Sequence, residues 1–167
     1  MPHVYPVPSF AKFARNLLVL VALVSILQAA EGSRDWIRGI YTKGSPAPKR
    51  IPSSLTLSEA QALAAQTGGC SVITGRGDSM APLYPDGTVL VVAQRPYDAL
   101  KRGMTVVYRN RANRSVAHVL VARANDGWRV TGLNNRNHDG EGVDASNLVG
   151  VVIAAFQPVP GIAVSQR

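Results

Sequence analysis

Six short runs rich in Val, Ile, Leu and Thr follow residue 70, and they limit the possible folds of this chain more than any other feature. Runs of this length and composition favour β-strands over helices. Turn sequences such as Pro85-Asp86-Gly87 and Asn125-Asp126-Gly127 separate them. The pattern therefore predicts a mostly β domain, built as a compact coiled barrel or sandwich. The predicted strands are 71–74, 88–93, 105–109, 115–122, 128–132 and 148–156.

Length and composition are compatible with this fold and exclude several alternatives. The chain has 167 residues, of which 46% are hydrophobic, so one domain with a real core is expected and wholesale disorder is excluded. Cys70 is the single cysteine, which rules out an intramolecular disulfide and CxxC motifs. With three histidines in all, a large histidine-based metal cluster is not expected.

The N-terminal segment 1–30 has the features of a signal peptide or signal anchor. Residues 17–30 are almost entirely apolar, and Lys12 and Arg15 precede them. Fourteen helical residues span about 21 Å, which is less than the ~30 Å hydrocarbon core and favours a cleaved signal peptide. An anchor extended towards Phe10 remains open, as does a buried core helix. The signal-like layout favours export, although a strict count of flanking Lys and Arg favours a cytoplasmic C-terminal part.

A linker and a helix are expected between this segment and the strands. Residues 44–54 contain three prolines and three serines, which is typical of an exposed linker. Residues 55–67 carry Leu and Ala at helical spacing and end at a glycine pair, which predicts a short amphipathic helix. The predicted domain organisation is thus a hydrophobic segment at 1–30, a linker at 31–54 and a β domain at 55–167.

The chain is basic, with 18 Lys and Arg against 10 Asp and Glu and a net charge of +8. Such a balance admits nucleic acid or an anionic membrane as a partner. The positive charge is spread out, however, and no basic run is interleaved with aromatic residues. We therefore expect a solvated basic loop or a face near anionic lipid, and no nucleic-acid partner.

Ser79 is the candidate nucleophile, in the loop sequence GRGDSMAPLYPDG at 75–87. A serine hydroxyl is a weak nucleophile and needs a neighbouring base. Loop glycines allow a backbone geometry that exposes Ser79 and turns N–H groups towards an oxyanion. Taken alone, a serine in such a loop is more typical of ordinary turn chemistry.

The surrounding sequence resembles the signal peptidase I family. The serine segment is also similar to that of the LexA-type self-cleaving repressors, which belong to the same superfamily. Further segments resemble other boxes of the family, and all occur in the family's order. The segments are Ser79–Pro82 followed by Asp86-Gly87, then Arg102–Tyr108, Ala117–Val121 and Thr131–Asp139.

The resemblance implies roles for particular residues. Ser79 would be the nucleophile, His118 the general base and Asp139 the acid that supports it. Histidine at the base position is similar to the archaeal and endoplasmic-reticulum type of signal peptidase, because the usual bacterial enzyme has lysine there. The resemblance also implies substrate contacts by Met80 and Pro82, an oxyanion hole that includes the Ser79 N–H, and no metal or organic cofactor.

Several positions depart from the family pattern or offer alternatives. Leu133 and Met104 stand where the family has aspartates, and Gly77 provides no hydroxyl for the oxyanion. These differences leave an inactive relative open. His138, which replaces the first of two paired acids, is a rival base, and Asp144 is a second candidate acid.

The expected function is that of a membrane-associated serine endopeptidase that cleaves secreted or membrane precursor polypeptides. Its domain would lie on the extracytoplasmic side, anchored by the N-terminal segment or released after removal of that segment. One alternative is a self-cleaving repressor relative, although residues 1–54 show no helix-turn-helix pattern. The other is an inactive exported binding module, since Arg76-Gly77-Asp78 spells an adhesion motif.

Overall fold

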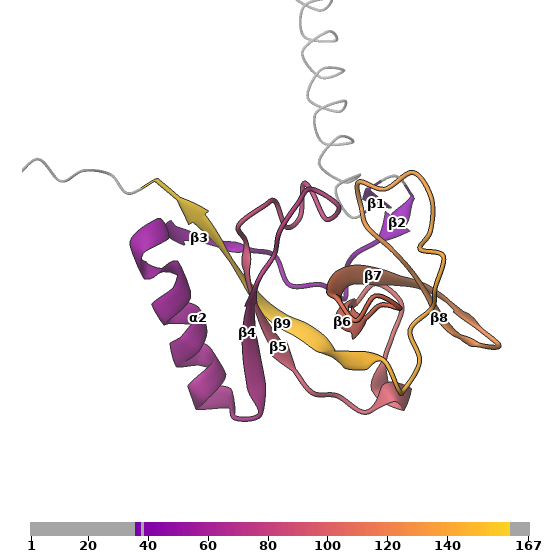
Figure 1. Cartoon of the computed structure of the whole chain (residues 1–167). Helices are drawn as coiled ribbons and strands as arrows, with labels where there is room; N and C mark the ends of the chain where they lie inside the picture. Colours follow the sequence, from indigo (N-terminus) through magenta and orange to yellow (C-terminus); the bar gives the residue numbers. More distant parts are fainter. Residues whose placement is uncertain (1–35, 38, 161–167) are drawn as a thin grey trace, which may run out of the picture. The chain divides into compact units, whose positions relative to one another are not determined.

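Seven strands of the computed structural model, which describes residues 36–37 and 39–160, form one sheet with α-helix α2 packed beside it (Figure 1). The strand order is β4-β5-β9-β6-β7-β8, with every neighbour antiparallel, and β3 pairs with β9 in parallel. The strands are β3 Lys49–Pro52, β4 Cys70–Thr74, β5 Val89–Ala93, β6 Thr105–Arg109, β7 Ser115–Ala124, β8 Gly127–Thr131 and β9 Leu148–Val159.

The predicted mostly β class is confirmed, and every predicted strand is present with its ends shifted by three residues at most. The structure adds the pair β1 Trp36–Ile37 and β2 Ile40–Tyr41, which forms a separate two-stranded sheet, and the 3-10 turn η2 Tyr97–Ala99. Runs of two residues carry no readable periodicity, which is why sequence patterning misses them.

Strand β5 is buried on both faces and joins two parts of the core. Successive side chains of a strand point to opposite faces. Leu90 and Val92 therefore pack in a cluster with Met80 and Tyr84, whereas Val89 and Val91 pack in a second cluster with residues of α2. This double burial explains why the strand is a continuous apolar run rather than an alternating one.

Helix α2 Ser53–Thr67 corresponds to the helix predicted over 55–67. It ends at Gly68, which has a φ of +71° and whose N–H donates to the Ala64 carbonyl at 3.1 Å. The buried face is formed by small residues such as Thr56 and Ala60, whereas Leu55 and Leu57 are about half exposed at 49% and 51%. Small side chains let the helix approach the sheet closely. Leu63 packs on this buried face as its spacing suggested, whereas Leu55 and Leu57 lie outside it.

The segment expected to be an exposed linker contributes to the sheet. Residues 49–52 form β3, which pairs with the last residues of β9, and Ile51 is buried against α2 and β5. The Ser45 hydroxyl donates to the Gly103 carbonyl at 2.7 Å, which attaches the preceding residues as well. The proline-rich composition of this segment predicted a linker rather than a strand. Pro52 is tolerated because it is the last residue of β3, where the ladder needs no N–H donor.

The predicted signal segment 1–30 lies outside the described residues, and the domain boundaries stay a prediction. Within the part of the chain that the structure describes, no helix is long and apolar enough to cross a bilayer.

Candidate active site

Three separate elements bring Ser79, His118 and Asp139 together. Ser79 lies in the loop between β4 and β5, His118 lies within β7, and Asp139 lies in the loop between β8 and β9. The Ser79 Oγ is 3.1 Å from His118 Nε2, and His118 Nδ1 is hydrogen-bonded to Asp139 Oδ2. An ionised carboxylate only accepts hydrogen bonds, so Nδ1 carries the proton and Nε2 directs its lone pair at the hydroxyl.

Backbone hydrogen bonds fix the turn that presents Ser79. Gly77 has a φ of +81°, a conformation that favours glycine, and its N–H donates to Asp86 Oδ1 at 2.6 Å. On the other side, the Asn134 N–H donates to the Ser79 carbonyl at 2.8 Å. Asp86 therefore does more than form a turn with Gly87, because its carboxylate accepts a hydrogen bond that stabilises the Ser79 loop.

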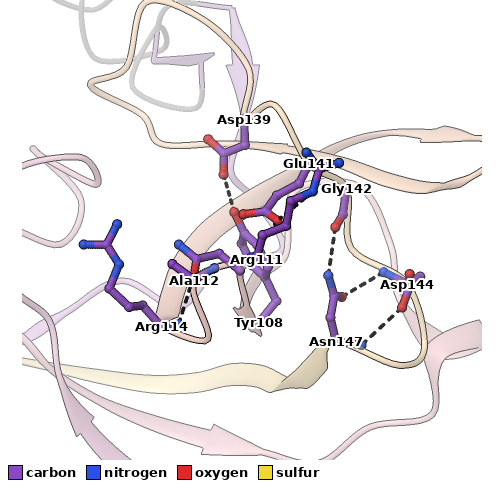
Figure 2. Close-up of polar contacts among 10 residues, drawn as sticks. Tyr108, Arg111, Ala112, Arg114, Asp139, Glu141, Gly142, Asp144 and Asn147 are labelled. Atoms are coloured by element: carbon purple, nitrogen blue, oxygen red, sulfur yellow. Dashed lines mark hydrogen bonds and ion pairs between the residues drawn. The ribbon is translucent and has the colours of Figure 1, made fainter.

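Tyr108 is a site residue that the sequence analysis missed. Register places Val106 opposite His118, so Tyr108, two residues further along β6, faces the same side of the sheet. Its hydroxyl donates to Asp139 Oδ2 at 2.5 Å, as Figure 2 shows. The same oxygen contacts His118 Nδ1. Burial and the adjacent carboxylate raise the pKa of Tyr108 far above its usual value, which keeps the hydroxyl a donor.

Gly132 is a second missed residue, and its role is to leave space. A Cβ at this position would lie 2.6 Å from the Ser79 carbonyl oxygen and 2.9 Å from His118 Nε2. Both distances are shorter than any ordinary contact, so a side chain here would push the serine and histidine apart. The glycine is visible in the sequence, but nothing in the sequence shows what it faces.

The backbone N–H of Ser79 is available to an incoming oxyanion. Within residues 39–160 it donates to no acceptor, whereas the N–H of Gly77 is already bonded to Asp86. The arrangement thus combines a hydroxyl, a base that accepts its proton, a supporting carboxylate and a free donor. These are the parts that acyl transfer through a serine requires.

A comparison with known protein families agrees with this chemistry. The chain matches the family described as Peptidase S24-like over residues 39–153. The chain belongs to this family. The match supports the LexA and signal peptidase superfamily and indicates a serine peptidase. Among curated proteins, none matches the chain.

In this member of the S24-like family, the serine and the histidine line two adjoining hollows. Ser79 and Met80 line one hollow of about 430 Å³, whereas His118 and Asp139 line another of about 380 Å³. Asn110 and Val116 line both hollows, so the two share a wall. Met80 is 5% exposed and packs in the core beneath the serine.

The remaining candidate residues lie elsewhere. Pro82 is exposed, follows a cis peptide bond and lines neither hollow. His138 is exposed, and in the described part of the chain it makes no hydrogen bond and no contact with Ser79. Asp144 accepts hydrogen bonds from Ser146 and Asn147, as Figure 2 shows for Asn147, and the Ser146 hydroxyl lowers the pKa of Asp144. Asp144 therefore stabilises its own loop rather than the histidine.

Two departures from the family pattern have structural explanations. Leu133 is fully buried in the cluster that contains Met80, so an apolar residue is required there. The Met104 sulfur accepts the Lys101 N–H at 3.3 Å, and Met104 lies directly before β6 and lines neither hollow at the site. Among residues 39–160, no group of three or more His, Cys, Asp and Glu side chains is placed to hold a metal ion.

Proposed function

We propose that this protein is a serine endopeptidase of the signal-peptidase type that uses Ser79 as nucleophile, His118 as general base and Asp139 as its supporting acid. The observation that carries the proposal is the continuous hydrogen-bonded series from the Ser79 Oγ through both ring nitrogens of His118 to Asp139 Oδ2. Ser79 also lines a hollow that is open to a substrate, so the series ends at an accessible nucleophile.

The proposed reaction has two half-reactions. As the Ser79 Oγ attacks a peptide carbonyl carbon, its proton passes to His118 Nε2, and the Ser79 N–H stabilises the oxyanion. The C–N bond then breaks, and the imidazolium returns the proton to the leaving amine. Water, deprotonated by the same nitrogen, attacks the ester and releases the acid. Asp139 favours the imidazolium at each stage, because its carboxylate accepts the Nδ1 proton.

A histidine base supports the archaeal and endoplasmic-reticulum type within the superfamily. Of the described lysines, Lys43, Lys49 and Lys101, none lines the two hollows at the site. His118 is 6% exposed and already has partners on both ring nitrogens. A neutral imidazole accepts a serine proton near neutral pH without the desolvation that a lysine base needs.

The proposed substrates are precursor polypeptides at a membrane. This part of the proposal rests on the apolar run 17–30 and its basic flank, which are typical of a signal anchor or signal peptide. The catalytic domain would lie on the extracytoplasmic side. Fractionation of cells that express the full chain tests the membrane association. Protease protection of spheroplasts tests the side on which the domain lies. A protected domain would contradict the proposed orientation.

The test of the activity is cleavage of precursor peptides by the full chain in detergent. Ser79→Ala and His118→Ala should each reduce kcat/KM by at least about 10³-fold, because members of such a unit act together. His138→Ala is the matched control, since that histidine is exposed and makes no contact with Ser79. This variant should retain the parent's rate. A folded parent that is no faster than Ser79→Ala would refute the proposal.

Self-cleavage is a second candidate, favoured by the match to the Peptidase S24-like family. In that case the scissile bond would belong to this chain itself. Incubation of the purified full chain at several concentrations distinguishes the two. A chain that cuts itself within one molecule does so at a rate independent of concentration, whereas an enzyme acting on other molecules accelerates as it is concentrated.

A further inference from the structure

The hollow beside Ser79 has an unusual combination of linings. Its apolar wall includes Ile73, Met80 and Leu90, and its rim includes Arg76 and Arg114. The two arginines come from different segments, one from the loop after β4 and the other from the residue before β7. No Asp or Glu is among the lining residues, so the hollow is apolar at its base and cationic at its rim.

Neither arginine is held in an ion pair among the described residues. The nearby Glu141 is already engaged, because its carboxylate accepts the Arg111 backbone N–H at 2.9 Å and lies 3.8 Å from the Arg111 side chain. Figure 2 shows the Arg114 side chain extending away from this pair. Within residues 39–160, Arg76 and Arg114 form no ion pair. The two guanidinium groups at one hollow raise the local positive potential. Asp78 and Asp86 of the same loop offset part of it, and the Asp86 carboxylate already accepts the Gly77 N–H.

Asn110 adds a neutral donor to the same hollow. Its side-chain Oδ1 accepts two backbone N–H groups, from Ala112 at 3.1 Å and from Arg114 at 2.9 Å. These two donors identify the oxygen of the amide, so the Nδ2 group points the other way. In the described part of the chain this NH₂ group donates to no acceptor. The lining thus presents guanidinium and amide donors and no Asp or Glu side chain.

We propose that the Ser79 site binds and cleaves polypeptide segments that carry an acidic side chain near the scissile bond, with Arg76 and Arg114 binding the carboxylate. This inference rests on the proposed peptidase function. A guanidinium matches a carboxylate with two parallel N–H donors, and such charge-assisted bonds are about twice as strong as neutral ones. The apolar wall then accommodates the uncharged residues beside the acidic one.

The experiment compares two peptide pools that are identical except for one residue. A neutral pool of Ala, Val and Gly peptides carries a single Gln at each of eight positions in turn, and the second pool has Glu in its place. Cleavage by the full chain in detergent is followed by mass spectrometry. We expect at least one position where Glu raises kcat/KM by about tenfold over Gln, a gain limited by solvent screening at an exposed rim.

Variants assign the preference to the rim. In the double variant Arg76→Gln, Arg114→Gln, the preference should fall to about twofold or less. The Glu-to-Gln ratio is measured within each variant, so any change in the overall rate cancels. Arg129→Gln is the matched control, because it removes one exposed arginine on β8 outside the hollow and should leave the preference intact. A preference that survives in the double variant, or that Arg129→Gln abolishes equally, overturns the inference.

Binding separates this inference from the proposed activity. The same Glu and Gln peptides, labelled with a fluorophore, are titrated with the full-chain Ser79→Ala variant and followed by anisotropy. A Kd about tenfold lower for the Glu peptide supports the acidic preference even if the parent cleaves neither pool, a result that would refute only the peptidase proposal. Equal Kd values together with equal cleavage rates overturn the inference and leave the peptidase proposal standing.

Discussion

Asp139 Oδ2 is the atom on which the site's geometry depends. It accepts hydrogen bonds from both His118 Nδ1 and the Tyr108 hydroxyl, and its side chain is only 12% exposed. A carboxylate that is shielded from water relies on such donors for its stabilisation. Tyr108 is 1% exposed and belongs to a strand in the core, so it fixes the carboxylate in place. We regard Tyr108 as a positioning residue that acts through Asp139.

Tyr108→Phe tests this role. The change removes one hydroxyl and keeps the ring that packs in the core. It should lower kcat by about tenfold with KM nearly unchanged, because substrate contacts are not affected. The kcat and KM of the variant are measured alongside its melting temperature. A fall in the melting temperature without a fall in kcat would show that the tyrosine supports only the fold.

Gly132→Ala should have a larger effect on rate than on stability. The added methyl would lie within 3 Å of both the Ser79 carbonyl oxygen and His118 Nε2, so the Ser79 backbone and the His118 ring must shift. Displacements of this size commonly cost about 10² in rate. Gly140→Ala is the matched control, because its added Cβ meets nothing within 4 Å. Equal rates for the two variants would contradict the geometry described here.

Among the elements, β9 has the most neighbours, since β3, β5 and β6 all pair with it. It spans residues 148–159 and contains register shifts opposite Val91 and Val107. Such irregularities bend a strand and increase its twist. The bend allows one strand to continue from one part of the core to the next.

Gly150 is required where β9 passes the end of its neighbour β5. A Cβ there would lie 2.5 Å from the Ala93 carbonyl oxygen, which belongs to the backbone and has little freedom to move. Gly150→Ala should therefore destabilise the domain by about 1–3 kcal/mol. Urea unfolding followed by fluorescence measures the change. A free energy of unfolding equal to that of Gly140→Ala would contradict this close approach.

The sequence predicted the strands well because each is a β-branched run bounded by turn residues. It did not predict β3, because residues 49–52 carry no alternation and become a strand only through pairing with β9. At the site, the order of the segments pointed to Ser79, His118 and Asp139, which the fold brings together. Tyr108 and Gly132 were missed, because their roles depend on distances across the sheet that no local pattern records.

At the scale of the whole molecule, two buried tyrosines couple stability to alkaline pH. Burial raises the pKa of both Tyr84 and Tyr108 well above the usual value of about 10. The folded state therefore keeps both neutral while the unfolded chain ionises above about pH 10. Their contribution to stability is complete below that pH and is lost as the pH rises further, by up to about 1.4 kcal/mol per pH unit for each tyrosine.

Tyr84→Phe tests this coupling. The Tyr84 hydroxyl donates to the Pro46 carbonyl at 2.7 Å, so the variant should lose about 1 kcal/mol at pH 8. Between pH 10 and 11.5 it should lose stability less steeply than the parent, because one of the two groups is gone. Urea midpoints across this range provide the comparison, and parallel curves would contradict the assigned cause.

Labelling by a fluorophosphonate probe tests whether His118 activates Ser79. The probe reacts with activated serines, and mass spectrometry of the full chain in detergent locates the adduct. We predict one adduct, on Ser79, which is absent in His118→Ala and retained in His138→Ala. An adduct on another serine, or undiminished labelling of Ser79 in His118→Ala, would contradict the claim.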